Sequence, residues 1–439
     1  MKFGGSSLAD RPQIEKAAHI IADRSDRRPV VVCSAHRGVT DLLLQEARRA
    51  QTGQQAGQEV IRRQRTIASD VGLPESELET LYQELLDTLR GISLLREMTP
   101  RIRDLVQSFG ERMSVRVVAH VLCSMGLDAK AFDAFDIGFV TDAHHGSARP
   151  TPEAYRLIPS RLEGELRKGT VPVITGFVGQ TARGDITTVG RNGSDYSAAV
   201  LAAALGAEEC QIWTDTDGVM TADPNLVPGA RNIPHMSFAE ASELARYGGR
   251  VLHPSTLVPA MERNVPVRVL NTNRPTHPGT VITEAEGHQT IGEITSIAYK
   301  EHQTVLTIES STMLGQPGFL ARVFGLLGDA QVDLDMISTS EVTVSMTTRE
   351  ALDDEVLLAK LRSFGRVEVM RQRALVCIVG RKIRSEPLIS ARVFQALAEA
   401  EVEVGMISHG AHSMNLGVMM ADADVARAVP ALHAAFFGA

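Results

Sequence analysis

The chain has 439 residues, which is more than one ordinary domain needs and predicts two or three domains. Hydrophobic residues make up 44% and charged residues 22%, the proportions of a globular protein that can bury a sizeable core. A formal net charge of -8 argues against a basic nucleic-acid-binding face, although it is compatible with a local basic pocket for phosphate.

The cysteines show no pattern of a redox or metal site. Cys33, Cys123, Cys210 and Cys377 are far apart in the sequence and form neither CxxC nor Cys/His spacing. We therefore expect buried, reduced thiols rather than disulfides or zinc ligands. No stretch is typical of a signal or transit peptide, and no apolar run approaches the ~20 residues of a membrane span. These features predict a cytoplasmic protein.

Short apolar runs alternate with helical patterns in the first half of the chain. Residues 28–34, 170–175 and 209–214 are typical of buried strands, and Asp195–Leu205 predicts an alanine-rich helix. This alternation predicts an α/β fold in which helices sandwich a mostly parallel sheet. Residues 54–113 instead carry helical spacing throughout, and we interpret them as a helical insertion, either a moving lid or a plain decoration.

The last third of the chain contains an internal repeat behind a polar linker near residue 284. Ala321-Arg-Val-Phe recurs as Ala391-Arg-Val-Phe, and Met336-Ile-Ser recurs as Met406-Ile-Ser. Both pairs share one register, because 391−321 and 406−336 each give 70. The register predicts two copies of one small α+β unit, and we expect the copies to pair their sheets side by side and to regulate the α/β domain.

The chain opens with a lysine next to a glycine-rich turn. Lys2 precedes Gly4, Gly5 and Ser6. Such a turn can aim backbone N–H groups and a hydroxyl at a phosphate, while the lysine supplies a point charge. The GxxxxGK[ST] pattern is absent, so this is not a Walker A loop. A plain strand-turn is the structural alternative.

A second glycine cluster, residues 188–197, leads into the alanine-rich helix. Ser194 and Asp195 stand where an N-cap belongs, and a helix N-terminus favours a nearby anion. Arg191 offers the planar fork that grips a carboxylate. A capped loop that leaves Arg191 in solvent is the alternative.

Polar residues follow the predicted strand 209–214, at the strand end where open α/β sheets bind ligands. These residues can contact a nucleotide or help to order Mg²⁺, and they comprise Thr214, Asp215, Asp217, Thr221 and Asp223. A pair of Asx-turns is the structural alternative. The EF-hand pattern fails, because no Glu closes a loop of the required length.

Two further motifs place a charge beside glycine. Gly110-Glu111-Arg112 ends the helical insertion, where it could also be only a solvated pair at a helix start. Tyr247-Gly-Gly-Arg250 supplies a glycine turn with a cation. With the clusters above, these motifs favour phosphoryl transfer to a small anionic substrate, a reaction that needs positioning and charge neutralisation more than covalent catalysis. No cluster of metal-ligating histidines stands out, so we expect no metal site built from the protein alone.

The motifs, taken in the order in which they occur along the sequence, resemble those of the aspartate kinase family over essentially the whole chain. Single motifs are shared with other amino-acid kinases, whereas the ordered set is specific. The signatures are Lys2-Phe-Gly-Gly-Ser-Ser, Ser34-Ala with Gly38-Val-Thr40-Asp, Gly110-Glu-Arg-Met-Ser, Gly190-Arg-Asn-Gly-Ser-Asp-Tyr-Ser-Ala, Trp213-Thr-Asp-Thr-Asp-Gly with Asp223-Pro, and Val251-Leu-His-Pro.

The resemblance implies an amino-acid kinase domain over 1–283, with the insertion at about 54–113. It further implies a linker and first regulatory strand over 284–302, and ferredoxin-like ACT modules over 303–372 and 373–439. ATP and Mg²⁺ are the implied cofactors and L-aspartate is the implied substrate. The implied product is 4-phospho-L-aspartate, which leads to lysine, methionine and threonine.

The resemblance also assigns roles to residues. Lys2 and Asp195 would be the catalytic pair, with Lys2 on the transferred phosphate. Aspartate would be bound by Ser34, Thr40, Glu111, Arg191 and Ser194, with Glu111 on the amino group and Arg191 on a carboxylate. ATP would be contacted by Gly4, Gly5, Ser6, Thr214, Asp215, Asp217, Thr221, Asp223 and Arg250.

The first ACT copy is similar to that of lysine-sensitive members, which implies lysine as an allosteric effector. The implied effector residues are Met313, Gln316, Gly318, Phe319, Leu320, Asp335, Thr339, Ser340 and Glu341. The alternative is that these residues only pack an ACT dimer. Because ACT modules pair across subunits, a homodimer or larger assembly is expected.

Three positions depart from the family pattern. The chain begins almost at Lys2, where family members carry a few more strand residues. Arg250 replaces a lysine and Asn225 replaces an arginine near the nucleotide. A kinase for glutamate, acetylglutamate or uridylate is one alternative, and a catalytically dead amino-acid sensor is another. The ACT repeat and Glu111 argue against the other kinases. The retained Lys2, Arg191 and Asp195 argue against the sensor, whereas the short N-terminus and Arg250 leave it open.

Overall fold

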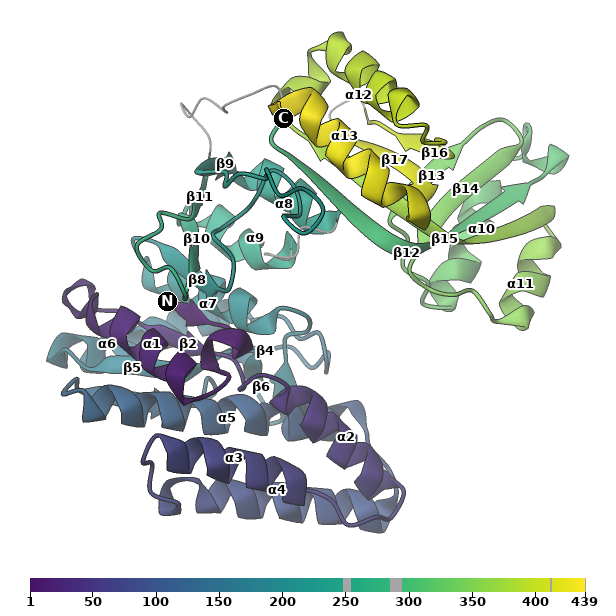
Figure 1. Cartoon of the computed structure of the whole chain (residues 1–439). Coiled ribbons are helices and arrows are strands. Elements are labelled where there is room, and N and C mark those ends of the chain that lie inside the picture. Colours follow the sequence, from purple (N-terminus) through teal and green to yellow (C-terminus); the bar gives the residue numbers. More distant parts are fainter. Residues whose placement is uncertain (248–253, 285–293, 411–412, 439) are drawn as a thin grey trace. The chain divides into compact units, whose positions relative to one another are not determined.

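The structure is a computed structural model that describes residues 1–247, 254–284, 294–410 and 413–438. It divides into two compact units (Figure 1). The first comprises Met1–Val219, Pro234–Phe238 and the described part of Val251–Glu286. The second comprises Met220–Ile233 and the described parts of Ala239–Arg250 and Gly287–Ala439.

The first unit is built on an eight-stranded sheet with the order β3-β5-β2-β1-β8-β10-β11-β9. All its strand pairs are parallel except β10 with β11. The strands are β1 (Lys2–Phe3), β2 (Val31–Cys33), β3 (Ala129–Phe132), β5 (Val171–Thr175), β8 (Cys210–Thr214), β9 (His235–Ser237), β10 (Val267–Asn271) and β11 (Thr280–Thr283). A smaller sheet contains β4 (Val140–Thr141), β6 (Val178–Thr181) and β7 (Ile186–Thr188).

Helices cover both faces of the large sheet. On one side α1 and α5 pack with α2, α3 and α4, and on the other α6, α7 and α9 pack together (Figure 1). The sequence prediction of a mostly parallel sheet sandwiched between helices is therefore confirmed. The helices are α1 (Arg11–Ala22), α2 (Val39–Gln51), α3 (Gln58–Asp70), α4 (Ser76–Leu95), α5 (Pro100–Ser124), α6 (Pro152–Lys168), α7 (Gly193–Leu205) and α9 (Pro254–Glu262).

Strand β1 is only two residues long, yet it lies in the middle of the sheet between β2 and β8. Successive side chains of a strand point to opposite faces. Phe3 enters the core shared with α1 and α5, where its ring stacks on Trp213 at 5.9 Å between centroids. Lys2 consequently points to the opposite face, which α7 covers.

The second unit contains the internal repeat. Its six-stranded antiparallel sheet has the order β13-β14-β12-β15-β17-β16. The strands are β12 (Ser296–Glu309), β13 (Met336–Thr339), β14 (Thr343–Thr348), β15 (Arg366–Val379), β16 (Met406–Ser408) and β17 (Asn415–Ala421). The helices are α8 (Phe238–Arg246, of which all but Phe238 belongs here), α10 (Phe319–Asp329), α11 (Glu355–Arg362), α12 (Pro387–Glu399) and α13 (Val425–Phe437).

The two copies of the repeat are interleaved through the long strands β12 and β15. The end of β12 places Leu306 and Ile308 in the core of the first copy, together with α10 and α11. The start of β12 places Ile297 in the core of the second copy, together with α12 and α13. The second copy therefore takes one of its strands from the segment that precedes the first copy.

One expectation about the cysteines was wrong. Cys33, Cys210 and Cys377 are buried free thiols as expected, but Cys123 is exposed, because it lies near the end of α5. Among the described residues, no helix combines the length and the apolar character needed to cross a membrane.

Candidate active site

An ion pair joins the first strand to helix α7. The Lys2 Nζ lies 2.6 Å from Asp195 Oδ1, and the two residues are only 9% and 6% exposed. Lys2 reaches Asp195 because it points to the face of the sheet that α7 covers. A buried cation held by a carboxylate at the end of a central parallel strand is well placed to meet an anionic ligand.

Helix α7 begins at Gly193, so the expected N-cap role of Ser194 and Asp195 was wrong. Asn192 precedes the helix in the left-handed conformation, with φ of 52°, and makes no side-chain cap. Ser194 and Asp195 therefore lie inside the first turn, where the helix dipole favours negative charge. Ser194 also packs tightly against Gly176, because a Cβ added to Gly176 would lie 2.6 Å from the Ser194 Cβ.

The glycine turn after β1 abuts the loop after β2. A Cβ on Gly5 would lie 2.9 Å from the Ala35 carbonyl oxygen, so only glycine fits between the two backbones. Gly4 lies beside Lys2, whose Nζ is 3.2 Å from where a Gly4 Cβ would be. Ser6 is half-buried in the 3₁₀ turn Gly5–Leu8. The turn thus brings a lysine and backbone groups together, as a phosphate cradle requires.

Glu111 is buried in the middle of α5, so the alternative of a solvated pair at a helix start was wrong. It is 3% exposed, and its Oε1 accepts a hydrogen bond from the Ala35 N–H at 3.1 Å. Its Oε2 is buried without a hydrogen-bond partner. Burial raises the pKa of Glu111 to about 8. A carboxylate with one unpartnered oxygen is suited to pair with a substrate cation.

The remaining predicted substrate residues lie on separate segments, two after β2 and one before α7. Ser34 directly precedes Ala35, and Thr40 lies in the first turn of α2; both are half-buried. Arg191 is exposed on the loop before α7, after Gly190, whose φ of +86° is the left-handed region that favours glycine. Described contacts bring together Lys2, Gly4, Gly5, Ala35, Glu111, Gly176, Ser194 and Asp195.

The predicted nucleotide residues of the first unit follow β8. Thr214 is half-buried at the strand end, where its carbonyl accepts the Thr272 N–H at 2.8 Å, and Asp215 is exposed. Asp217 accepts hydrogen bonds from Asn271 and Arg274. These groups lie at the same edge of the sheet as Lys2, because β1 and β8 are parallel neighbours.

Thr221 and Asp223 belong to the second unit, where both side chains hold other groups. The Thr221 hydroxyl lies 2.9 Å from His433 Nε2 and accepts the Arg231 N–H at 2.9 Å. Asp223 accepts the Asn225 N–H and Nδ2 at 2.9 Å each, which forms the Asx-turn offered as an alternative. Arg250, the last predicted nucleotide residue, lies outside the described residues.

Comparisons with known proteins show the family to which the chain belongs. Residues 1–271 match the amino acid kinase family, and residues 306–359 and 376–436 match the ACT domain. Aspartokinase 2 of the Arabidopsis thaliana chloroplast is 38% identical over 459 residues, which cover 100% of this chain and 84% of that protein. The chain belongs to the aspartokinase family.

Solved structures of another aspartokinase are similar to this one over nearly the whole chain. Escherichia coli aspartokinase III in complex with aspartate and ADP, in its R state, is 33% identical with a TM-score of 0.85, covering 99% of each chain. The same enzyme with lysine and aspartate, in its T state, has a TM-score of 0.81 at 33% identity, covering 99% of this chain and 98% of that one. The family resemblance and the fold class inferred from the sequence are therefore confirmed.

The predicted effector residues of this aspartokinase lie in the first ACT copy, in two segments. Around the start of α10, Phe319 is buried against Phe364 with the rings edge to face at 5.8 Å, while the flanking Met313, Gln316, Gly318 and Leu320 are partly or fully exposed. Around β13, Thr339, Ser340 and Glu341 are exposed. Asp335 pairs with Lys300 at 2.8 Å.

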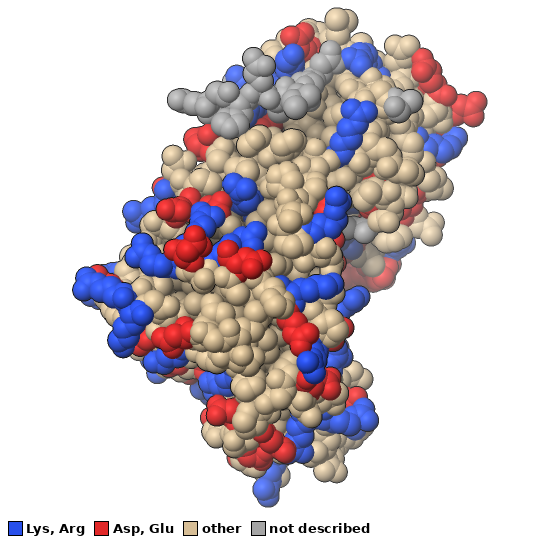
Figure 2. All heavy atoms as spheres, turned by 60° about the vertical axis from the view of Figure 1, so that its left-hand side comes forward, with Lys and Arg blue, Asp and Glu red and all other residues tan. Residues whose placement is uncertain are grey.

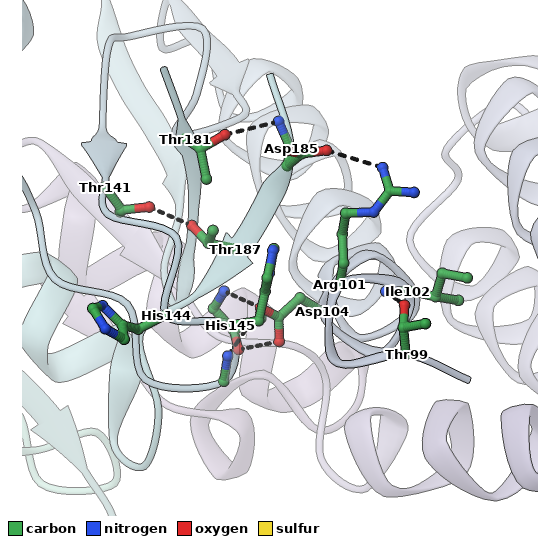
Figure 3. A network of polar contacts seen from close by, with 12 residues as sticks. Thr99, Arg101, Ile102, Asp104, Thr141, His144, His145, Thr181, Asp185 and Thr187 are labelled. Atoms are coloured by element: carbon green, nitrogen blue, oxygen red, sulfur yellow. Dashed lines mark hydrogen bonds and ion pairs between the residues drawn. The ribbon is translucent and has the colours of Figure 1, made fainter. Parts of the chain in front are cut away.

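Sequence reasoning missed a buried carboxylate in this aspartokinase, Asp104 of α5, which lies two helical turns before Glu111. Figure 3 shows it at the centre of a polar network between α5 and the small sheet. The signal that could have found it is the seven-residue spacing from Glu111, which places both side chains on one side of a helix.

The surface of the aspartokinase carries charges of both signs. On the face shown in Figure 2, lysine and arginine side chains alternate with aspartate and glutamate side chains over the described residues.

Within the described part of the chain, no group of three or more histidine, cysteine, aspartate or glutamate side chains is arranged to hold a metal ion.

Proposed function

We propose that the first unit transfers the γ-phosphoryl group of ATP to the side-chain carboxylate of L-aspartate, giving 4-phospho-L-aspartate. The observation that carries this proposal is the buried Lys2–Asp195 pair, set at one edge of the sheet with a buried Glu111 whose Oε2 is unpartnered. The aspartate and ADP bound by the similar E. coli enzyme support it. The product enters the synthesis of lysine, methionine and threonine.

The reaction forms one bond and breaks one. An oxygen of the substrate's side-chain carboxylate attacks the γ-phosphorus, the bond from that phosphorus to the β,γ-bridging oxygen breaks, and ADP leaves with the electron pair. Lys2 neutralises charge on the transferred group, and Asp195 holds Lys2 in place. Arg191 binds a substrate carboxylate through its fork, and Glu111 binds the ammonium group.

Mg²⁺ accompanies the nucleotide in this proposal. The ion keeps most of its ligands from water and phosphate and needs only one or two protein carboxylates. Asp215, which is exposed after β8, and Asp195, whose Oδ1 pairs with Lys2, would supply such carboxylates. When bound, the ion supplies charge neutralisation for the phosphate oxygens.

The second unit is proposed to bind lysine and to inhibit the first unit. The lysine complex of the similar E. coli enzyme supports this role, as does the exposure of most predicted effector residues. We further propose that the ACT copies pair across subunits in a homodimer or larger assembly, and that the enzyme works in the cytoplasm. The Arabidopsis relative is chloroplastic by name, which makes a plastid the other compartment to test.

The deciding experiment is an ATP- and Mg²⁺-dependent assay in which the acyl phosphate is trapped as a hydroxamate. We expect product with L-aspartate and none with L-glutamate, and we expect suppression by lysine but not by threonine. A folded sample that bound lysine and formed no hydroxamate would contradict the kinase and favour a pure amino-acid sensor. Suppression by threonine alone would overturn the effector assignment and leave the kinase standing.

A further inference from the structure

Asp104 is a fully buried carboxylate that accepts hydrogen bonds from four donors. Its Oδ2 accepts the N–H of Gly146 at 3.0 Å, the N–H of Thr188 at 3.1 Å and Nδ1 of His145 at 2.9 Å. Its Oδ1 accepts the Thr188 hydroxyl at 2.8 Å. Figure 3 shows Asp104 reaching from α5 towards His145 and the small sheet. One side chain thus fastens α5 both to the end of β7 and to the loop that contains His145 and Gly146.

Thr188 is the last residue of β7, and every polar group that it carries is engaged. Its N–H and hydroxyl go to Asp104, and its carbonyl accepts the Ala148 N–H at 3.0 Å. The next residue, Val189, donates its N–H to Phe177 at 3.0 Å. The chain is therefore fixed up to the point where the exposed Arg191 loop leaves the sheet.

The loop that contains His145 and Gly146, which we call the 146 loop, also packs against the residues that precede Arg191. A Cβ on Gly190 would lie 3.2 Å from the Gly146 carbonyl oxygen, so the 146 loop packs directly on the residue before Arg191. The 146 loop is itself held by Asp104 through Gly146 and His145. Both contacts therefore tie the base of the Arg191 loop to one carboxylate.

Asp104 and Glu111 lie on one side of the same helix. Seven residues correspond to about two turns, or roughly 10 Å along the axis. Glu111 faces Ala35 with one oxygen unpartnered, and Asp104 faces the strand that leads to Arg191. One helix therefore connects Glu111, which is proposed to bind the ammonium group of aspartate, to the base of the loop that carries Arg191, which is proposed to bind a carboxylate.

We propose that Asp104 is a positioning residue for the amino-acid substrate: it sets the distance between Glu111 and Arg191 and so prepares the site for aspartate. This inference rests on the proposed function, because it takes those two residues as the substrate's binding groups. Preorganised groups matter because a displacement of about 1 Å can cost on the order of 100-fold in rate. ATP binds through other residues, so its affinity is independent of Asp104.

The chain offers a matched control on the same strand. Thr187 precedes Thr188 in β7, is equally buried, and points to the opposite face, where its hydroxyl lies 2.7 Å from that of Thr141 (Figure 3). Thr187→Val therefore removes one buried hydroxyl hydrogen bond from the same strand without touching Asp104. Any effect due only to a weakened small sheet appears equally in this control.

The test compares steady-state constants of the full-length parent, Thr188→Val, Thr188→Ser, Thr187→Val and Asp104→Asn in the hydroxamate assay. We expect Thr188→Val to raise the KM for aspartate on the order of tenfold and Asp104→Asn to raise it roughly 10- to 100-fold. The KM for ATP stays within about twofold of the parent in every variant, and Thr188→Ser, which keeps the hydroxyl, returns the KM for aspartate to within about twofold.

Three results would overturn the inference. They are an unchanged KM for aspartate in Thr188→Val, an equal rise in Thr187→Val, and a parallel rise in the KM for ATP. If Asp104→Asn does not fold, the Thr188 and Thr187 pair still decides the question. A parent enzyme that forms no product from aspartate refutes the proposed function instead, so the two failures are distinct.

Discussion

Glu111 makes the binding of aspartate depend on pH in a direction that the structure fixes. Its pKa is raised to about 8 by burial, so at pH 7 only about one molecule in ten carries the ionised carboxylate. The proposed ammonium contact needs the ionised form. Below pH 8 the KM for aspartate should therefore fall by about tenfold for each unit of rising pH, and it should level off above pH 8.

Glu111→Gln removes both the charge and the titration. Loss of a hydrogen bond to a charged group costs about 1.5–3 kcal/mol, so the KM for aspartate above pH 8 should rise roughly 10- to 100-fold. The assay is the pH profile of kcat/KM for aspartate at saturating ATP, from pH 6 to 9, in parent and variant. The difference between the profiles isolates Glu111 from other groups that titrate, the substrate's own included.

The same pKa predicts an opposite trend for stability. Between the ordinary carboxyl value of 4.5 and about 8, the folded state holds a proton that the unfolded state releases. The free energy of unfolding should therefore fall as pH rises through this window, by up to about 1.4 kcal/mol per pH unit. Glu111→Gln, which resembles the protonated form, should lose this slope and be more stable than the parent at pH 8. A parent with a flat KM profile, or a variant with the parental slope, would refute the reasoning.

Three further substitutions test the rest of the molecule. Lys2→Met should abolish turnover and spare lysine binding measured by calorimetry, and surviving turnover would show that Lys2 is not catalytic. Arg191→Lys keeps the charge but loses the fork, so the KM for aspartate should rise roughly tenfold while the KM for ATP stays constant, and an unchanged KM would remove Arg191 from the substrate site. Phe319→Ala removes a buried ring packed on Phe364, and should destabilise the second unit by about 3–5 kcal/mol in scanning calorimetry. A second unit that melts at the parental temperature would contradict that estimate.

The sequence was a good guide where local chemistry decides the structure. Lys2 near Gly4 and Gly5 predicted a strand that ends in a glycine turn, and the structure adds the physical reason, a Gly5 backbone too close to Ala35 for any side chain. The use of this turn as a phosphate cradle stays a prediction. The buried runs became β2, β5 and β8, each shorter than the apolar stretch that predicted it. The repeat register likewise predicted two α+β copies in one sheet.

Long-range packing was not accessible in the same way. Glu111 beside Arg112 has the pattern of an ordinary exposed pair, and only the packing of α5 on the loop after β2 buries the first of them. Asp104 becomes significant only when Thr188, 84 residues later, is folded against it. The first turn of α7 was misplaced because Asn192 adopts a left-handed conformation, which a motif of glycine, serine and aspartate does not reveal.

The interleaving of the two ACT copies bears on how effector response can be transplanted or evolved. Since Ile297 fills the core of the second copy and Leu306, on the same strand, fills that of the first, no cut between 296 and 379 frees one copy intact. A chimaera that exchanges a single copy therefore breaks a strand of its neighbour. In this architecture effector specificity is exchanged by replacing both ACT copies together, or altered by single substitutions within them.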